Sequence, residues 1–154
     1  MEESVNTVDP IDSEQQTQNL LNKIYTSSEA RALNPLTLAF IGDAVYSAFV
    51  RKYLISQGIQ NVNHLTHISV HFVKANAQAS ALRILDDQLT EEEKGIVRRG
   101  RNTRSTPPKN ADKMDYRYAT GLEALIGFLN LTGQHEREFS LMTKIITFGE
   151  THKK

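Results

Sequence analysis

The chain has 154 residues, of which 39% are hydrophobic and 23% are charged, proportions typical of a globular protein with a buried core. It contains no cysteine, which excludes disulfides, thiolate catalysis and cysteine-based zinc sites. Eighteen acidic and eighteen basic residues cancel to a net charge of zero, yet the two signs are segregated along the chain.

Acidic and basic residues are concentrated in different segments of the chain. Residues 1–30 contain six acidic residues and one basic residue, whereas residues 94–117 contain eight basic and two acidic residues. Clustered Arg and Lys bind phosphate backbones, so the basic block is a candidate polyanion contact, with a solvated face as the alternative. The N-terminus has neither a secretory signal nor an Arg-rich transit peptide, and no apolar run is long enough to span a membrane. We therefore expect a cytoplasmic protein without membrane contact, with a plastid stroma left open.

The first predicted elements follow an N-terminal tail. Residues 1–13 have the composition of a disordered tail, and Ser13 is placed to cap a short helix. The apolar residues of that helix are Leu20, Leu21, Ile24 and Tyr25. Asn34 followed by Pro35 is the pattern of a helix N-cap and first helical position, which predicts a helix as far as about Leu54.

The rest of the chain also shows helical signals. Asn61 or Asn63 opens a short turn, and Ser69 is expected to begin the next helix. Thr90 and Glu93 match a capping box. The remaining helices are predicted over residues 69–85, 90–100, 116–131 and 134–148. No period-two alternation and no internal repeat occur, so the predicted fold class is all-α.

Two of the predicted helices are strongly apolar, and each carries one acidic residue near its middle, Asp43 and Glu123. Apolar helices pack centrally in a domain, so these two are expected to be neighbours with both acids buried. Glycines beside the acids, at positions 42, 121 and 127, indicate that the helices approach closely, because a helical glycine costs about 1 kcal/mol relative to alanine.

Two neighbouring carboxylates repel each other unless a cation separates them. A hard divalent cation such as Mg²⁺ binds to one or two carboxylates and retains several waters. The alternative is that each acid forms a structural ion pair with a nearby base, such as Arg117 or Lys74. The residues by themselves leave both interpretations open.

His64, His67 and His71 are spaced so that one continuous helix would align them as zinc ligands. Because Ser69 is expected to interrupt that helix, we predict no zinc site. The three imidazoles are instead expected at the surface, or, for His71, against a phosphate of the bound polyanion.

The stretch LAFIGDAV, residues 38–45, resembles the signature helix of the ribonuclease III domain, and YATGLEALIG, residues 118–127, resembles its second acidic motif. The stretch RGRNTRSTPPKN followed by YRYATGLEAL is similar to Mini-III, the small members of this family without a separate RNA-binding domain. The resemblance implies a ribonuclease III-type helical endonuclease domain over residues 28–149, with an acidic tail over 1–27 and a short tail over 150–154. Because the chain ends there, we expect no appended RNA-binding domain.

The resemblance also implies a site. The two acidic positions of the family fall on Asp43 and Glu123, which become the expected catalytic residues and metal ligands. Larger enzymes of the family have two further carboxylates, at positions that are Ala39 and Thr120 here, so the implied site is reduced. Thr120 is expected to orient a metal-bound water. The implied reaction is Mg²⁺-dependent hydrolysis of double-stranded RNA, with Mn²⁺ as a substitute, giving 5′-phosphate and 3′-hydroxyl ends.

The implied partners are RNA and a second copy of the chain. A two-fold dimer through the 35–54 helix would supply one site for each RNA strand. The residues expected to hold the RNA, at the end of the 90–100 helix and in the loop after it, are Arg98, Arg99, Arg101, Arg104 and Lys109. The expected RNA is the large-subunit (23S) ribosomal RNA precursor, and a large-subunit ribosomal protein is a further candidate partner. The alternative is a non-catalytic helical RNA-binding or ribosome-assembly factor with a degenerate site.

Overall fold

The computed structural model describes residues 10–151, and all regular elements in this range are helical. In chain order they are α1 (Pro10–Leu21), α2 (Ser27–Ala32), α3 (Pro35–Ser56), α4 (Val62–Val73), α5 (Ala75–Leu85), the 3-10 turn η1 (Asp86–Gln88), α6 (Glu91–Asn102), α7 (Lys113–Leu131) and α8 (His135–Thr151). The predicted all-α class is confirmed. None of these helices combines the length and the hydropathy needed to cross a bilayer.

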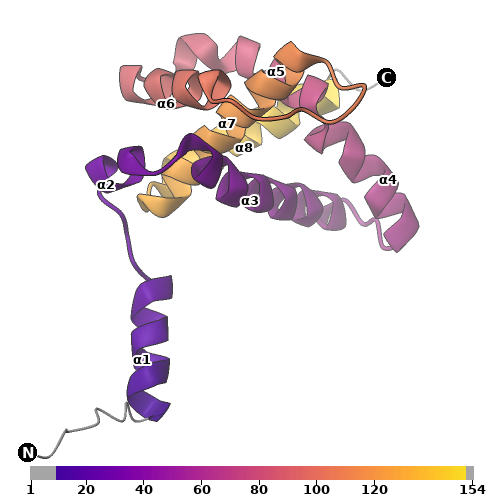
Figure 1. The fold of residues 1–154 in the computed structure, drawn as a ribbon. Coiled ribbons are helices and arrows are strands. Elements are labelled where there is room, and N and C mark those ends of the chain that lie inside the picture. Colours follow the sequence, from indigo (N-terminus) through magenta and orange to yellow (C-terminus); the bar gives the residue numbers. More distant parts are fainter. Residues whose placement is uncertain (1–9, 152–154) are drawn as a thin grey trace, which may run out of the picture.

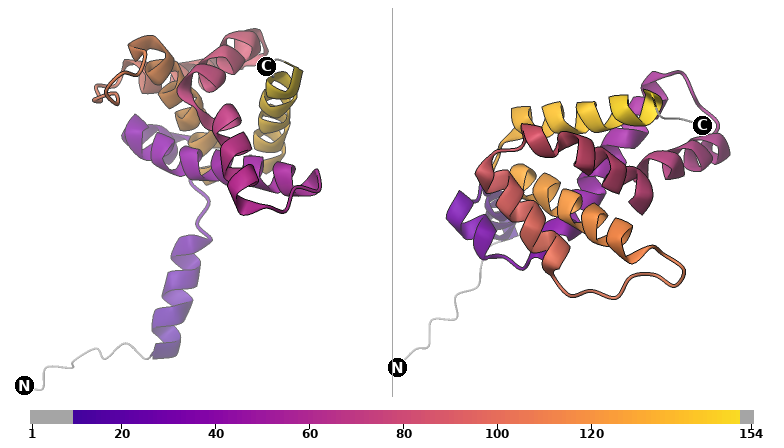
Figure 2. Two further views of the ribbon diagram at one scale, coloured as in Figure 1. Left: turned by 90° about the vertical axis from the view of Figure 1, so that its right-hand side faces the viewer. Right: turned by 90° about the horizontal axis from the view of Figure 1, so that it is seen from above.

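The helix α7 is the centre of the fold. Its residues from 119 to 129 are nearly all buried, and it contacts α3, α5 and α6 along its length. Figures 1 and 2 show α3, α5 and α6 arranged around α7. The last helix, α8, packs against α5 and α7. Because α7 carries Glu123 and α3 carries Asp43, the packing of these two helices positions both acids.

Glycines allow α7 to approach its neighbours closely, as the sequence predicted. A Cβ atom added at Gly42 of α3 would collide with the backbone carbonyl of Glu123, and one at Gly127 would collide with the carbonyl of Leu38. On the other side of α7, a Cβ at Gly100 of α6 would lie only 3.0 Å from the Cα of Gly121. The backbones of α3 and α7 therefore touch at the turn that carries the two acids.

The N-terminal segment differs from the prediction. α1 begins at Pro10, so Ser13 lies inside the helix, where its carbonyl accepts a hydrogen bond from Thr17, and does not cap it. α1 stands clear of the other helices (Figure 1), with Leu20 and Leu21 exposed. The rest of the predicted tail, residues 1–9, lies outside the described residues.

The predicted helix over 69–85 is wrong at its start. Asn61 caps α4 by accepting a hydrogen bond from the backbone of His64, and α4 continues through Ser69. The Ser69 hydroxyl bonds to the carbonyl of Thr66 one turn earlier, so it is accommodated within the helix. The break falls instead at Lys74, whose extended backbone separates α4 from α5.

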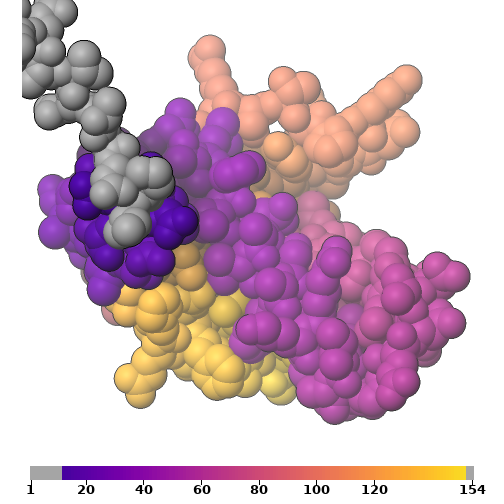
Figure 3. All heavy atoms as spheres, turned by 90° about the horizontal axis from the view of Figure 1, so that it is seen from below, coloured from indigo at the N-terminus to yellow at the C-terminus, as the bar shows by residue number. Residues whose placement is uncertain are grey.

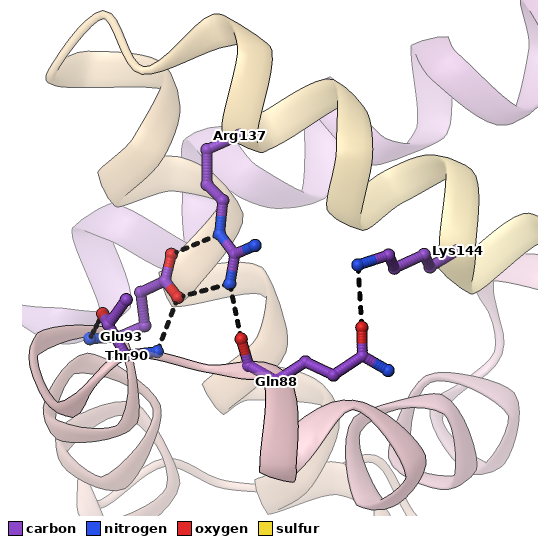
Figure 4. Close-up of polar contacts among 5 residues, drawn as sticks. All are labelled: Gln88, Thr90, Glu93, Arg137 and Lys144. Carbon is purple, nitrogen blue, oxygen red and sulfur yellow. Dashed lines mark hydrogen bonds and ion pairs between the residues drawn. The ribbon is translucent and has the colours of Figure 1, made fainter.

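An ion pair between a buried carboxylate and a half-buried guanidinium connects the N-terminus of α6 to α8 (Figure 4). Glu93 completes the predicted capping box with Thr90 and accepts two hydrogen bonds from Arg137, from Nε at 2.9 Å and from Nη2 at 2.8 Å. Burial raises the pKa of Glu93, but the bonds from Arg137 and Thr90 outweigh it and hold the pKa below its ordinary value. The carboxylate thus stays ionised and joins two helices on the side of α6 away from its basic end.

Candidate active site

Asp43 and Glu123 line one cleft of about 380 Å³ between α3, α5 and α7. Ala39, Thr120 and Gln78 also line it. The positions at which larger ribonuclease III enzymes would have additional carboxylates, Ala39 and Thr120, therefore open onto the same space as the two retained acids. The structure brings together every residue of the predicted catalytic site.

Asp43 is exposed, which corrects the expectation that it is buried. The core-facing residues of α3 recur every four positions, at Leu38, Gly42, Tyr46, Val50 and Leu54. Asp43 follows Gly42 and so lies about 100° around the helix, at the mouth of the cleft. The helix is apolar nearly all round because much of its outer face is also apolar, as shown by Phe40, which is 81% exposed.

Neither acid is neutralised by a base. Among residues 10–151, no ion pair includes Asp43 or Glu123, so the alternative of structural ion pairs with Arg117 or Lys74 is wrong. The only hydrogen bond to either carboxylate in this part of the chain is donated by Nε2 of Gln78 to Oε1 of Glu123, at 3.0 Å. The cleft therefore holds two carboxylates without a compensating positive charge.

Glu123 is half-buried, and its surroundings disfavour its ionised form. Burial raises the pKa of Glu123, the charge of Asp43 raises it further, and the hydrogen bond from Gln78 lowers it, which leaves the pKa at about 7. A cation in the cleft would interact favourably with both carboxylates and so favour their ionised forms. Oxygen ligands from two carboxylates and a hydroxyl fit a hard divalent cation such as Mg²⁺.

This raised pKa predicts a pH-dependent stability of the metal-free protein. Between the ordinary value of 4.5 and about 7, the folded protein retains a proton on Glu123 that the unfolded chain releases, so stability falls as pH rises through this range. Glu123→Gln removes this loss. In chelator, the variant should gain stability relative to wild type from pH 4.5 to pH 7 by at most about 3 kcal/mol and then remain constant, measured by urea unfolding. A constant difference across this range would contradict the assignment.

Gln78 was not predicted from the sequence. It is buried on α5 in register with the core residues Leu82 and Leu85. The sequence did contain an indication of its role, because Gln78 is polar at a position where the helical periodicity predicts an apolar, core-facing residue. Thr120 was predicted, and its hydroxyl donates to the carbonyl of Tyr116 at 2.9 Å, which leaves the oxygen lone pairs beside the cleft.

The three histidines do lie on one helix, contrary to the expected break at Ser69. His64 and His67 are nevertheless exposed, and His71 is half-buried. In the described part of the chain, no group of three or more histidine, aspartate and glutamate side chains is arranged to hold a metal. α4 thus provides no alternative metal centre.

The predicted RNA-binding residues fall into two sets. Arg99 donates to the carbonyl of Arg31 at 2.7 Å, and Arg101 lies over the ring of Tyr118 with its guanidinium carbon 5.1 Å from the ring centroid. Arg101 belongs to α6 and not to the following loop, because the helix continues past Gly100 to Asn102. The side chains of the second set are exposed and form no hydrogen bond or ion pair within residues 10–151. This set consists of Arg98, Arg104 and Lys109. The right panel of Figure 2 shows the loop of residues 103–112 extending from the bundle.

The ribonuclease III domain family matches residues 36–134, a span that contains Asp43, Thr120 and Glu123. The chain belongs to this family. The Mini-ribonuclease 3 of Thermoanaerobacter sp. (strain X514) is 51% identical over 116 residues, which cover 75% of this chain and 82% of the relative. The Mini-ribonuclease 3 of Enterococcus faecalis is 45% identical over 128 residues, which cover 80% of this chain and 97% of the relative.

A solved structure agrees with this assignment. The crystal structure of a Fusobacterium nucleatum protein matches with a TM-score of 0.69 at 32% identity, over 76% of this chain and 94% of that one. The predicted ribonuclease III-type fold and the resemblance to Mini-III are therefore confirmed. The chain is an endoribonuclease of the ribonuclease III type, a family whose enzymes are generally dependent on divalent metal ions.

Proposed function

We propose that this ribonuclease III-type enzyme hydrolyses double-stranded RNA at the cleft that contains Asp43 and Glu123, and that these two carboxylates would hold Mg²⁺ or Mn²⁺. The observation that carries the proposal is that two carboxylates from different helices face one cleft without a paired base. The raised pKa of Glu123 supports it, because repulsion between these groups is what a bound cation would relieve.

The two carboxylates and Thr120 then have different tasks. Asp43 and Glu123 would hold the cation, which, when bound, supplies activation of water and charge stabilisation at the leaving 3′ oxygen. Thr120 would orient a water through its hydroxyl oxygen. Attack of water on phosphorus with departure of the 3′ oxygen leaves a 5′-phosphate and a 3′-hydroxyl.

Dependence on a divalent cation is the direct test of this function. Purified protein should cut a long duplex RNA in buffer containing Mg²⁺, should fail to cut it in excess chelator, and should recover on addition of Mg²⁺ or Mn²⁺. Gel electrophoresis with 5′-end analysis measures both the cleavage and the product ends. Equal cleavage in chelator would rule out the metal mechanism.

The basic end of α6 and the loop after it are the surface that we propose for RNA binding. A-form RNA is recognised mainly through phosphates and 2′-hydroxyls, for which exposed guanidinium and ammonium groups are suitable donors. Arg98, Arg104 and Lys109 are free to make such contacts, whereas Arg99 and Arg101 also have partners within the protein. The loop leads directly into α7, the helix that carries Thr120 and Glu123.

The outer face of α3 is the surface that we propose for a two-fold homodimer. Seen from below in Figure 3, much of α3 lies at the surface, between the loop of residues 103–112 and α8. Phe40, Ala44 and Ala48 recur every four residues on this face and are all exposed. The two alanines would allow a second α3 to cross closely, and Phe40 would be covered by it.

This interface predicts that a bulky charged side chain within it produces a monomer. Wild type should have twice the 17.4 kDa chain mass in light scattering at micromolar concentration, and Ala48→Arg should have the mass of one chain. The matched control is Ala32→Arg at another exposed alanine, in α2, which should remain dimeric. A monomeric wild type that cleaves duplex RNA fully would contradict the proposed assembly.

We also propose the biological setting implied by similarity to Mini-ribonucleases. The RNA would be the 23S ribosomal RNA precursor, cut in the cytoplasm, with a large-subunit ribosomal protein as a candidate partner. Residues 28–149 would form the catalytic unit, flanked by the acidic segment 1–27 and the short segment 150–154. Incubation of precursor transcripts with the enzyme and mapping of the ends would test the choice of RNA.

A further inference from the structure

Gln78 is a buried polar side chain in the wall of the cleft, and the catalytic scheme above gives it no task. It is 1% exposed, in the first turns of α5. The same helical register places Leu82 and Leu85 in the core, so an apolar side chain would fit at this position. Burying an amide is costly unless its donor and acceptor are both satisfied.

Two hydrogen bonds determine how this amide is oriented. Nε2 donates to the backbone carbonyl of Val73 at 2.8 Å and to Oε1 of Glu123 at 3.0 Å. Both partners are acceptors when Glu123 is ionised, so only the nitrogen of the amide can face them. The amide oxygen of Gln78 is therefore turned away from both. It is buried and has no hydrogen-bond partner among residues 10–151.

The effect on Glu123 is to restrain one of its two oxygens. Gln78 is the only side chain in the described part of the chain that bonds to this carboxylate, and it binds Oε1, leaving Oε2 without a partner. The bond to Val73 anchors the amide at the end of α4, immediately before the extended residue Lys74. The orientation of Glu123 is thus linked to the junction between α4 and α5.

We propose that Gln78 is a positioning residue for the metal-binding carboxylate. It holds Oε1 of Glu123 through its amide nitrogen, so that Oε2 would be presented to the cation. Metal ligands are commonly oriented by such outer hydrogen bonds, whose loss costs roughly 10–100-fold in metal affinity. This inference rests on the metal site proposed at Asp43 and Glu123.

The test measures metal binding in the absence of RNA. Gln78→Met keeps the length and approximate volume of the side chain but removes the amide donor and acceptor. By calorimetric titration with Mn²⁺, well below the melting temperature of each variant, Gln78→Met should bind roughly 10–100-fold more weakly than wild type. Gln88→Met, the same change at an exposed glutamine, is the matched control and should bind as wild type does.

A kinetic measurement separates positioning from a structural role. Cleavage by Gln78→Met should be lost at low Mg²⁺ and restored towards wild type at high Mg²⁺, with an unchanged KM for RNA. A variant that is merely less well folded would show no rescue by Mg²⁺ at a temperature where it remains folded, and that result would overturn the inference.

The outcomes distinguish this inference from the proposal on which it rests. If Gln78→Met binds Mn²⁺ as wild type does while Asp43→Asn does not, the metal site stands and the positioning role of Gln78 is wrong. If wild type does not bind Mn²⁺, or Asp43→Asn binds it equally well, both fail. If Gln78→Met does not fold, Gln78→Asn, shorter by one methylene, makes the same comparison, and unchanged affinity in that variant overturns the inference.

Discussion

Asp43→Asn and Glu123→Gln should each reduce the cleavage of duplex RNA by at least about a thousand-fold, equivalent to about 4 kcal/mol of transition-state stabilisation. Each change keeps the shape of the side chain and removes the negative charge of a proposed metal ligand. Because the cleft offers no third carboxylate near these two among residues 10–151, the loss cannot be compensated locally. Single-turnover cleavage with saturating enzyme measures the chemical step directly.

The control is Asp87→Asn, the same amide substitution at an exposed aspartate in η1, which should cleave as wild type does. Melting temperatures provide the second comparison. Asp43 is exposed and unpaired, so Asp43→Asn should melt close to wild type, and Glu123→Gln should melt higher in chelator at neutral pH. Near-normal cleavage in either active-site variant, with the fold intact, would show that the reaction does not depend on these carboxylates.

The N-termini of several helices and the proximity of the two acids could be predicted, because each depends on the chemistry of a few local residues. Asn34 and Thr90 do cap their helices as expected. Gly42 and Gly127 indicated close approach of the two acidic helices, and a side chain at either would collide with the facing backbone. Glycine inside an apolar helix has few physical roles, so the sequence was sufficient to predict the close approach of the two helices.

The errors arose where tertiary context decides between equally plausible local outcomes. Ser69 can cap the start of a helix or, inside a helix, donate a hydrogen bond to a carbonyl of the preceding turn. Because Asn61 already caps α4, the helix continues through Ser69. Asp43 was expected in the core because α3 is apolar on all sides, but one of those sides lies at the surface. Gln78 has a task only beside Glu123, 45 positions away in the sequence, and no local pattern contains that contact.

Replacing Arg98, Arg104 and Lys109 together with alanine should weaken binding to duplex RNA far more than it slows cleavage at saturating RNA. Each lost phosphate contact reduces counterion release, so the slope of log affinity against log salt should become shallower by somewhat under one unit per contact, or about two to three units in total. All three side chains are exposed and free of partners within residues 10–151, so stability should hardly change. Binding titrations at several salt concentrations, with chelator to prevent cleavage, measure the slope.

The choice of these three residues follows from the structure. Arg101 is left unchanged because it lies within α6 against Tyr118, and Arg99 because it bonds to the backbone of α2, so replacing either would mix folding with binding. The control removes three exposed positive charges elsewhere, at Lys23, Arg31 and Lys144. If binding depends on local contacts, the control should keep the wild-type salt slope. If it depends on net charge alone, both triple variants should weaken binding equally, and the basic end of α6 with its loop would then be an ordinary solvated face.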